Sequence, residues 1–153
     1  TVDPARLQAF YNSLPPATIR TFRPFGDSAT LERCRQVIAE NLADPRNRYD
    51  LIAQQGTEPV GWAYLADLTK TQPYLGIVVA EPVRRKGLGK ALMAMLLGWA
   101  RFQHLPAVYL MVVQDNEPAI NLYRSLGFEV YDEEFDEIDQ LSYFHMVVKF
   151  DQP

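Results

Sequence analysis

The fold of this 153-residue chain follows from one segment, Val79-Ala80-Glu81-Pro82-Val83-Arg84-Arg85-Lys86-Gly87-Leu88-Gly89-Lys90. Residues 75–80, which lead into it, form a short continuous apolar run, as is typical of a strand covered on both faces. After the glycines, apolar side chains recur with the spacing of one helix face, at Leu88, Ala91, Leu92, Met95, Leu96 and Trp99. The sequence therefore predicts a buried strand, a turn and an amphipathic helix in direct succession.

The turn between that strand and that helix has the composition of an anion-binding site. The start of a helix presents unpaired backbone N–H groups and the positive end of the helix dipole, and glycines at 87 and 89 would let a bulky anion approach them. Arg84, Arg85, Lys86 and Lys90 add four cations that suit phosphate oxygens. A diphosphate fits such a turn, but ordinary loops share this composition, so the turn alone leaves both interpretations open.

Two well-known nucleotide motifs are absent from the chain. It contains no Gly-x-x-x-x-Gly-Lys-[Ser/Thr] P-loop and no Gly-x-Gly-x-x-Gly dinucleotide fingerprint. The net charge of -4 also argues against a nucleic-acid-binding module that would use residues 84–90, because such modules carry excess positive charge. We therefore expect no nucleic acid partner.

Length and composition predict one domain, residues 1–153, with 48% hydrophobic residues to fill a core. The single Cys34 cannot form an internal disulfide and falls on an apolar helical stripe, so we expect a buried structural thiol.

No secretory signal pattern opens the chain and no apolar run is long enough to span a membrane, which predicts a cytoplasmic protein. Two histidines, one cysteine and scattered carboxylates form no recognisable ligand set, so no metal is expected.

Hydrophobic periodicity and turn residues predict the remaining elements. Helices are expected at 4–14, 28–43, 88–99 and 118–126, and strands at 18–23, 51–54, 60–68, 75–80, 108–113, 128–131 and 144–149. Residues 132–139 hold six carboxylates and are expected to form an exposed loop, which either attracts a cationic substrate or is simply solvated. This order predicts an α/β protein of the mixed α+β kind, with a sheet of about seven strands covered by helices on both faces.

A second motif begins 29 residues after Gly87: Asn116-Glu117-Pro118-Ala119-Ile120-Asn121-Leu122-Tyr123-Arg124-Ser125-Leu126-Gly127-Phe128. Together with Arg84-x-x-Gly87-x-Gly89, it resembles the GNAT family of N-acetyltransferases, and the element order is similar over nearly the whole chain. The resemblance implies an acyl-CoA N-acyltransferase-like fold. In that fold the sheet is mostly antiparallel, and two neighbouring parallel strands at its centre splay apart.

The resemblance further implies acetyl-CoA as cosubstrate. Its diphosphate would lie on the backbone amides of residues 85–90, and its pantetheine arm would pair with residues 77–79. The Val79 N–H would stabilise the oxyanion of a tetrahedral intermediate, and Asn116 would contact the arm. The implied coenzyme-binding residues are Ile77, Val78, Val79, Arg84, Arg85, Lys86, Gly87, Leu88, Gly89, Lys90, Asn116 and Tyr123.

By the same resemblance, Tyr123 would protonate the departing coenzyme thiolate, so the implied catalytic residues are Tyr123 and Val79. A phenol with a pKa of about 10 can donate to the sulfur of a thiol whose pKa is about 8.5. The alternative for Tyr123 is an aromatic side chain that packs into the core from a short helix.

The sequence departs from the family pattern at the general base. Some members carry a glutamate on the strand that corresponds to 75–80, but Pro73 stands at the matching position here. The attacking amine must still lose a proton, either to ordered water or to a side chain. The candidates are Tyr74, Asp67, Tyr64 and Glu81, with His104 and His145 less favoured.

Taken together, these features predict an N-acetyltransferase that moves an acetyl group from acetyl-CoA to a primary amine by direct attack. We expect a small-molecule amine as the acceptor. Protein lysines or N-termini are the alternative acceptors, and a non-catalytic CoA-binding regulatory module is the alternative function. The resemblance also allows a homodimer.

Overall fold

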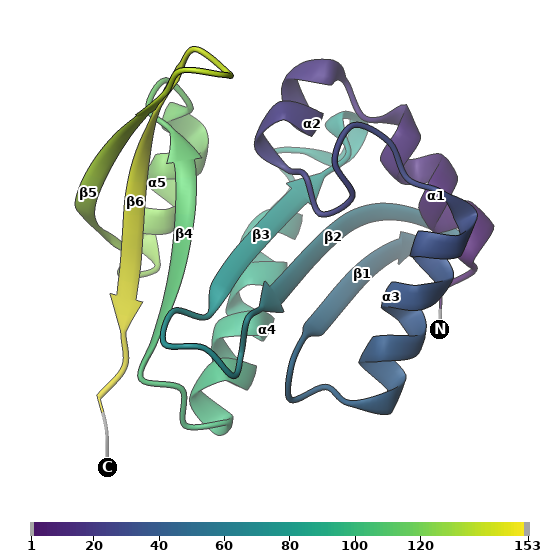
Figure 1. The fold of residues 1–153 in the computed structure, drawn as a ribbon, viewed down its shortest axis with the longest axis horizontal. Helices are drawn as coiled ribbons and strands as arrows, with labels where there is room; N and C mark the ends of the chain where they lie inside the picture. The colour runs from purple at the N-terminus through teal and green to yellow at the C-terminus, as the bar shows by residue number, and fades with distance from the viewer. Residues whose placement is uncertain (1, 152–153) are drawn as a thin grey trace.

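The computed structural model describes residues 2–151, in which six strands form one sheet in the order β1-β2-β3-β4-β6-β5 (Figure 1). All neighbouring strands are antiparallel except β3 and β4, which are parallel. The strands are β1 (Tyr49–Gln55), β2 (Glu58–Ala66), β3 (Tyr74–Val79), β4 (Ala107–Val113), β5 (Glu129–Asp136) and β6 (Leu141–Lys149).

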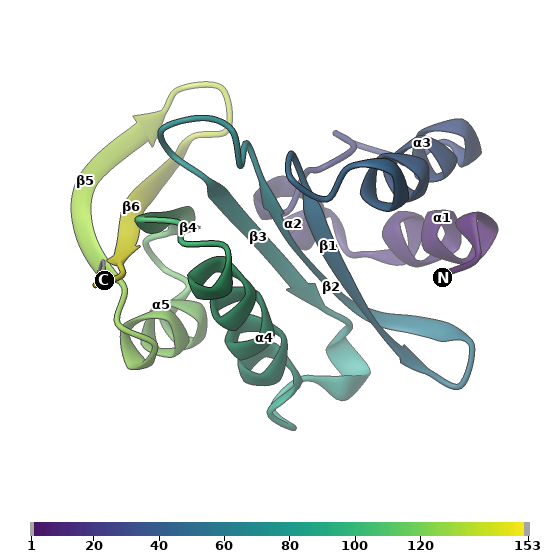
Figure 2. The same ribbon diagram turned by 90° about the horizontal axis from the view of Figure 1, so that it is seen from below.

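Helices cover both faces of this sheet, as the sequence predicts (Figure 2). One face carries α1 (Pro4–Ser13), α2 (Pro16–Thr21) and α3 (Leu31–Ala43), and the other carries α4 (Leu88–Phe102) and α5 (Glu117–Ser125). Each face has its own apolar core, one around Trp62 and Tyr11, the other around Met93 and Met146. None of the described helices is long and apolar enough to cross a membrane.

The predicted strand at 18–23 is wrong, which is why the sheet has six strands and not about seven. This segment lies in the short helix α2 and the loop that follows it. Pro16 at the first helical position favours a helix start, and the N–H groups of Thr18 and Ile19 both donate to the Pro15 carbonyl. In so short a segment, the alternation of apolar and polar residues cannot distinguish a strand from one turn of helix.

The predicted loop at 132–139 is also largely wrong. Strand β5 continues to Asp136 and pairs with β6, so that only the turn between the two strands is irregular. The Asp136 carboxylate closes this turn by accepting hydrogen bonds from the N–H groups of Ile138 and Asp139, at 2.8 and 2.9 Å. Because β5 is an edge strand with mostly exposed side chains, it shows no apolar alternation that the sequence could reveal.

The other predicted elements are confirmed with small shifts at their ends. Cys34 is buried on α3, as expected. Gly127 has a φ of 93° just after α5, the left-handed conformation that glycine adopts most readily at a helix end.

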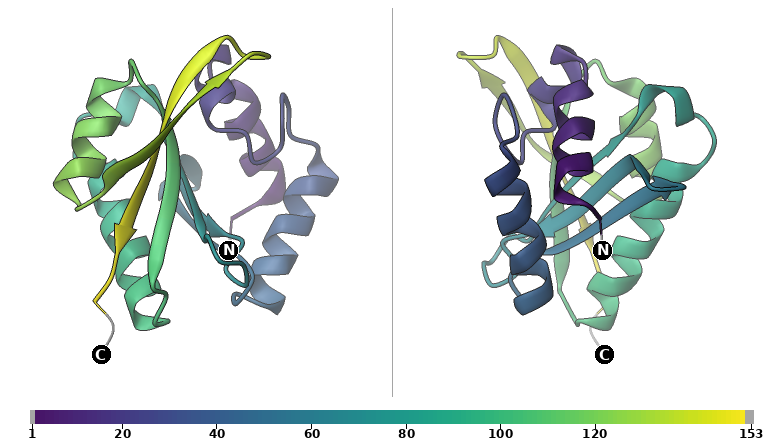
Figure 3. Two further views of the ribbon diagram at one scale, coloured as in Figure 1. Left: turned by 60° about the vertical axis from the view of Figure 1, so that its left-hand side comes forward. Right: turned by 90° about the vertical axis from the view of Figure 1, so that its right-hand side faces the viewer.

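The parallel strands β3 and β4 meet only where they begin. Tyr74 is paired with Tyr109, and the Tyr109 N–H donates to the Pro73 carbonyl at 2.9 Å. Beyond this point the two strands diverge toward their carboxyl ends (Figure 1). The turn between β5 and β6 and the short helix α2 both lie at this diverging end (Figures 1 and 3). The splayed parallel pair that the family resemblance implies is therefore present.

Gly76 is the position where β3 tolerates no side chain. A Cβ atom at residue 76 would lie 2.5 Å from the ring of Tyr64, which packs across it from β2. We expect Gly76→Ala to lower the free energy of unfolding by about 1–3 kcal/mol, as overpacking does. Urea unfolding measures this change.

Gly98→Ala is the matched control, because a Cβ at residue 98 on α4 would contact nothing within 4 Å. This change should raise the stability by up to about 1 kcal/mol, since alanine favours helix. An unfolding free energy for Gly76→Ala equal to that of the unmodified protein would contradict the packing described here.

Candidate active site

Backbone donors line the open edge of β3. The Ala80 N–H donates to the Val60 carbonyl at 2.8 Å, so it points toward β2. Because successive N–H groups along a strand point to opposite edges, those of Ile77 and Val79 point toward β4. The only pairing of β3 with β4 is at Tyr74, so these two donors have no strand partner within residues 2–151. The opening thus presents two aligned N–H groups.

Val78 lies between these two donors and faces the other way. Its backbone is in register with Trp62 of β2, and its side chain is buried in the core under α1 and α3. Of the three strand residues expected to contact the coenzyme, Ile77 and Val79 therefore offer backbone donors, whereas Val78 packs the strand in place.

The start of α4 provides a second group of backbone donors. Its N-cap, Gly87, has a φ of 82° and no side chain caps the helix. The first helical hydrogen bond runs from the Ala91 N–H to the Gly87 carbonyl at 3.0 Å, which leaves the N–H groups of Leu88, Gly89 and Lys90 without intrahelical partners. A Cβ at residue 87 would contact no atom within 4 Å, so crowding does not require a glycine at this position. The left-handed backbone conformation of residue 87 does favour glycine there.

Cationic side chains surround this helix start. Arg85, Lys86 and Lys90 are exposed, and within the described part of the chain none of them forms an ion pair. Arg85 also has a positive φ, 62°, so the turn contains two left-handed residues. Together with the helix dipole, these charges make the turn attractive to a diphosphate.

The Arg84 side chain forms hydrogen bonds within the protein. Its Nε donates to the Val79 carbonyl at 2.9 Å, and its Nη2 donates to the Thr18 hydroxyl at 3.4 Å. The guanidinium therefore joins the end of β3 to α2, and it holds the peptide on the carboxyl side of Val79 in a fixed orientation.

Two further residues connect the helix starts with the strands. A Cβ at Gly89 would lie 3.7 Å from both Val79 and Leu122, so the start of α4, the end of β3 and α5 meet here. Asn116 follows β4 and caps α5, since its side-chain oxygen accepts from the Ala119 N–H at 3.4 Å. Its amide nitrogen has no hydrogen-bond partner among residues 2–151, so it can contact a ligand.

Tyr123 reaches the opening from the α5 face. The side chain is only 8% exposed and its ring packs against Phe128. The Tyr123 hydroxyl forms no hydrogen bond within the described residues. Among these residues, no buried side chain has a fully buried oxygen without a hydrogen-bond partner, so the Tyr123 hydroxyl oxygen retains some contact with solvent. Burial, and next the proximity of Tyr74, raise the pKa of Tyr123 well above its ordinary value. The phenol therefore stays protonated at neutral pH.

Tyr74 reaches the same opening from the opposite face, where it packs beside the core under α1 and α3. The backbone N–H of Met111 on β4 lies close enough to the Tyr74 hydroxyl to oppose, with a smaller effect, the rise in its pKa that burial causes. In a closed parallel pair, that N–H would donate to a carbonyl of β3. The Tyr74 hydroxyl thus lies near a backbone N–H that has no strand partner on β3 within the described residues. Burial raises the pKa of Tyr74, so this hydroxyl is also protonated at neutral pH.

The structure does not bring the other candidate bases to the opening. Tyr64 is buried against Phe22 and carries the Arg48 guanidinium 4.3 Å above its ring. Asp67 follows β2 at the closed end of the strand pair and forms an ion pair with Lys70. Glu81 is exposed on the short 3-10 turn Glu81–Val83, and His104 follows the end of α4. His145 on β6 is hydrogen-bonded to Glu134 on β5, with 2.7 Å between its Nε2 and the Oε2 of the glutamate. Of the candidates, only Tyr74 lies in the opening.

Sequence reasoning missed two cations at the mouth of this opening. Arg20 lies on α2 and Arg23 on the loop after it, and Arg23 reaches the β5–β6 turn, where its Nη1 lies 3.6 Å from the Asp139 carboxylate. The Tyr143 hydroxyl donates to the same carboxylate at 3.4 Å. More than 100 residues separate Arg23 from Asp139, so no local pattern in the sequence could reveal their proximity.

A mostly antiparallel sheet with one splayed parallel pair, beside an uncapped helix start, defines the acyl-CoA N-acyltransferase-like fold. The family model for the acetyltransferase (GNAT) family matches residues 7–128, and the chain belongs to that family.

Named relatives agree with this assignment. The chain is 37% identical over 92 residues to N-alpha-acetyltransferase RimI of Mycobacterium tuberculosis, covering 58% of this chain and 56% of that protein. It is 34% identical over 108 residues to mycothiol acetyltransferase of Segniliparus rotundus, covering 67% of this chain and 40% of that protein. The chain spans about half the length of the curated relatives it matches.

A solved structure agrees in fold. The crystal structure of a ribosomal-protein-alanine N-acetyltransferase from Brucella melitensis superposes with a TM-score of 0.78 at 23% identity, covering 97% of this chain and 94% of that chain.

The contact between Tyr74 and Met111 leads to a direct test. Tyr74→Phe removes the hydroxyl that lies near the Met111 N–H, and a buried donor left without a polar neighbour costs about 1–3 kcal/mol. We expect a loss of stability in this range, measured by urea unfolding, and faster hydrogen exchange of the Met111 amide.

Tyr109→Phe serves as control, because the Tyr109 hydroxyl makes no hydrogen bond in the described structure and Tyr109 also lies on β4. Its effect should stay within about 0.5 kcal/mol. Equal effects of the two substitutions on stability and on Met111 exchange would contradict the role given to Tyr74.

Proposed function

We propose that this chain is an acetyl-CoA-dependent N-acetyltransferase that moves an acetyl group to a primary amine by direct attack. The observation that carries the proposal is the row of free donors that runs from Ile77 and Val79 on β3 to the uncapped start of α4. Amide groups of a pantetheine arm can pair with the strand donors, and a diphosphate can bind at the helix start. Membership of the GNAT family supports the same activity.

Each part of the coenzyme has residues suited to it in this proposal. The backbone N–H groups of residues 85–90, including those of Gly87, Leu88 and Gly89, bind the diphosphate, while the cations Arg85, Lys86 and Lys90 neutralise it. Ile77 and Val79 pair with the pantetheine arm, and the Asn116 amide contacts it. Arg84 and Val78 act indirectly, because they hold the end of β3 in place.

The reaction begins when the neutral amine nitrogen attacks the thioester carbonyl carbon. The new C–N bond converts the carbonyl oxygen into an oxyanion, which the Val79 N–H stabilises by hydrogen bonding. Collapse of this intermediate breaks the C–S bond, and Tyr123 donates a hydrogen bond to the departing sulfur. The pKa of a phenol already lies above that of a thiol, and burial raises the pKa of Tyr123 further. Its main contribution is therefore this hydrogen bond, and a proton that passes to the sulfur is replaced from solvent.

The proton of the amine leaves through water in this proposal. Tyr74 is the candidate base that lies in the opening, but burial keeps it protonated at neutral pH, so it can orient a water molecule and cannot itself act as the base. The amine nitrogen carries an extra proton after attack, and this proton passes to the same water.

A small-molecule amine is the acceptor that the structure favours. A pocket of about 430 Å³ beside α2 has the size of a small-molecule site, and a mycothiol acetyltransferase is among the relatives. A protein N-terminus is the second candidate, supported by the similarity to an N-alpha-acetyltransferase.

Release of the coenzyme A thiol from acetyl-CoA tests the proposed activity. One set of reactions holds pooled small amines, and another holds peptides with either a free or a blocked N-terminus. Thiol release that requires an acceptor confirms the transfer and identifies the acceptor class. Binding of acetyl-CoA without release in any pool would favour the non-catalytic CoA-binding module instead.

Tyr123→Phe tests the role of the phenol. We expect the turnover number to fall by about tenfold to a hundredfold, because the departing sulfur loses its hydrogen-bond donor. The dissociation constant for acetyl-CoA should change by less than about twofold, as measured by calorimetry. Tyr109→Phe is the control and should leave both values unchanged. Full turnover in Tyr123→Phe would show that the assigned role is wrong.

A further inference from the structure

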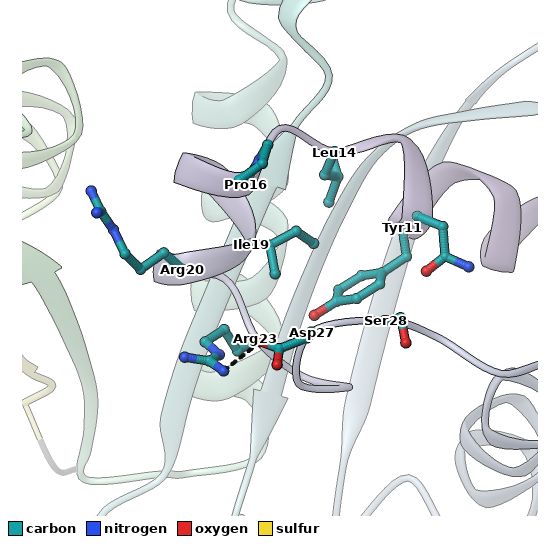
Figure 4. A pocket seen from close by; sticks show the side chains of 9 residues that line it. Tyr11, Leu14, Pro16, Ile19, Arg20, Arg23, Asp27 and Ser28 are labelled. Carbon is teal, nitrogen blue, oxygen red and sulfur yellow. Dashed lines mark hydrogen bonds and ion pairs between the residues drawn. The ribbon is translucent and has the colours of Figure 1, made fainter. Parts of the chain in front are cut away.

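A pocket of about 430 Å³ lies between α1, α2 and the loop that joins α2 to α3 (Figure 4). Apolar side chains of Leu14, Pro16 and Ile19 form one part of its wall, and polar side chains form the rest. The polar lining residues are Tyr11, Asn12, Arg20, Arg23, Asp27 and Ser28.

Arg84 joins α2, one of the elements that line this pocket, to the end of β3. Arg84 donates one hydrogen bond to the Val79 carbonyl and another to the Thr18 hydroxyl, at 2.9 and 3.4 Å. Thr18 directly precedes Ile19 and Arg20, which line the pocket. The helix that lines the pocket is therefore hydrogen-bonded, through Arg84, to the end of the strand where the thioester carbonyl is proposed to bind.

Most hydrogen-bonding groups of the pocket are already used within the protein. The Tyr11 hydroxyl donates to the Gly26 carbonyl at 2.6 Å. The Asn12 side chain bonds both the N–H and the carbonyl of Ala29, at 2.8 and 3.1 Å. The Asp27 carboxylate accepts from Nη2 of Arg23 at 2.7 Å.

The groups that remain available are mainly donors. Arg20 is exposed and has no carboxylate within ion-pair distance in the described part of the chain. Nη1 of Arg23 has only the Asp139 carboxylate at 3.6 Å, which is longer than a hydrogen bond. Figure 4 shows Arg20 and Arg23 extending in the same direction from α2 and from the loop after it. A ligand that satisfies these groups must bring acceptor oxygens.

We propose that Arg20 and Arg23 bind a carboxylate of the acceptor, and this proposal rests on the proposed N-acetyltransferase activity. The acceptor is then an amino acid or another small amine that carries a carboxylate. Guanidinium groups bind carboxylates through paired, charge-assisted hydrogen bonds. The apolar wall at Leu14, Pro16 and Ile19 suits a short carbon skeleton. The acidic β5–β6 turn is not the main attraction for the acceptor, because Arg23 and Tyr143 already engage Asp139.

Binding without turnover tests this proposal directly. The probes are the N-acetyl derivatives of the common L-amino acids, each compared with its uncharged C-terminal amide, and calorimetry measures their dissociation constants. At least one acid should bind about tenfold or more tightly than its amide. Arg20→Gln should remove this difference while it leaves the affinity for the amide unchanged.

Arg35→Gln is the matched control, because Arg35 is also an exposed arginine but lies on α3 and does not line the pocket. It should keep the preference for the acid. Arg23→Lys tests the second cation with its charge retained, and the preference should weaken because the planar guanidinium is lost.

The outcomes separate the two proposals. If no acid binds better than its amide, or if Arg20→Gln keeps the preference, the carboxylate site is wrong, whatever amines the protein acetylates. Transfer of acetyl to neutral amines as fast as to amino acids would also overturn it and would leave the proposed activity intact. Preferential binding of acids without transfer to any amine would support the site and refute the activity.

Discussion

The architecture is arranged around one interrupted pairing, that of β3 with β4. These strands are joined at Tyr74 and Tyr109 and then separate, which leaves the N–H groups of Ile77 and Val79 without strand partners. Unpaired backbone donors near a core are costly, so native folds keep few of them. The opening is stable because helices pack on both faces of the sheet and because the Tyr74 hydroxyl lies near the Met111 N–H, which has no partner on β3 in the described residues.

The same interruption brings distant residues to one place. It exposes the end of β3 beside the start of α4, and Tyr123 and Tyr74 approach it from opposite faces of the sheet. Arg84 links this centre to α2, the helix that also carries Arg20 of the pocket. The donor and acceptor sites that we propose are therefore connected through α2.

Local patterns predicted the features that are encoded within a few consecutive residues. The strand, turn and helix around Gly87 and the capped helix at Asn116 are of this kind, and the resemblance that they carry implied the splayed pair. Local sequence patterns gave wrong predictions where tertiary contacts determine the structure. The segment at 18–23 is too short for its period to be informative, and the acidic edge strand β5 is defined by pairing with β6. The positions of Tyr74 and Arg23 follow from contacts with Met111 and Asp139, which no local pattern contains.

Amide hydrogen exchange of Ile77 and Val79 tests the central claim most directly, namely that these N–H groups are free and receive the coenzyme. We predict that both exchange rapidly in the free protein and become protected when acetyl-CoA is added. The Ala80 amide, which already donates to the Val60 carbonyl, should be protected in both states. Protection of Ile77 and Val79 in the free protein, or exchange that acetyl-CoA does not slow, would contradict the account.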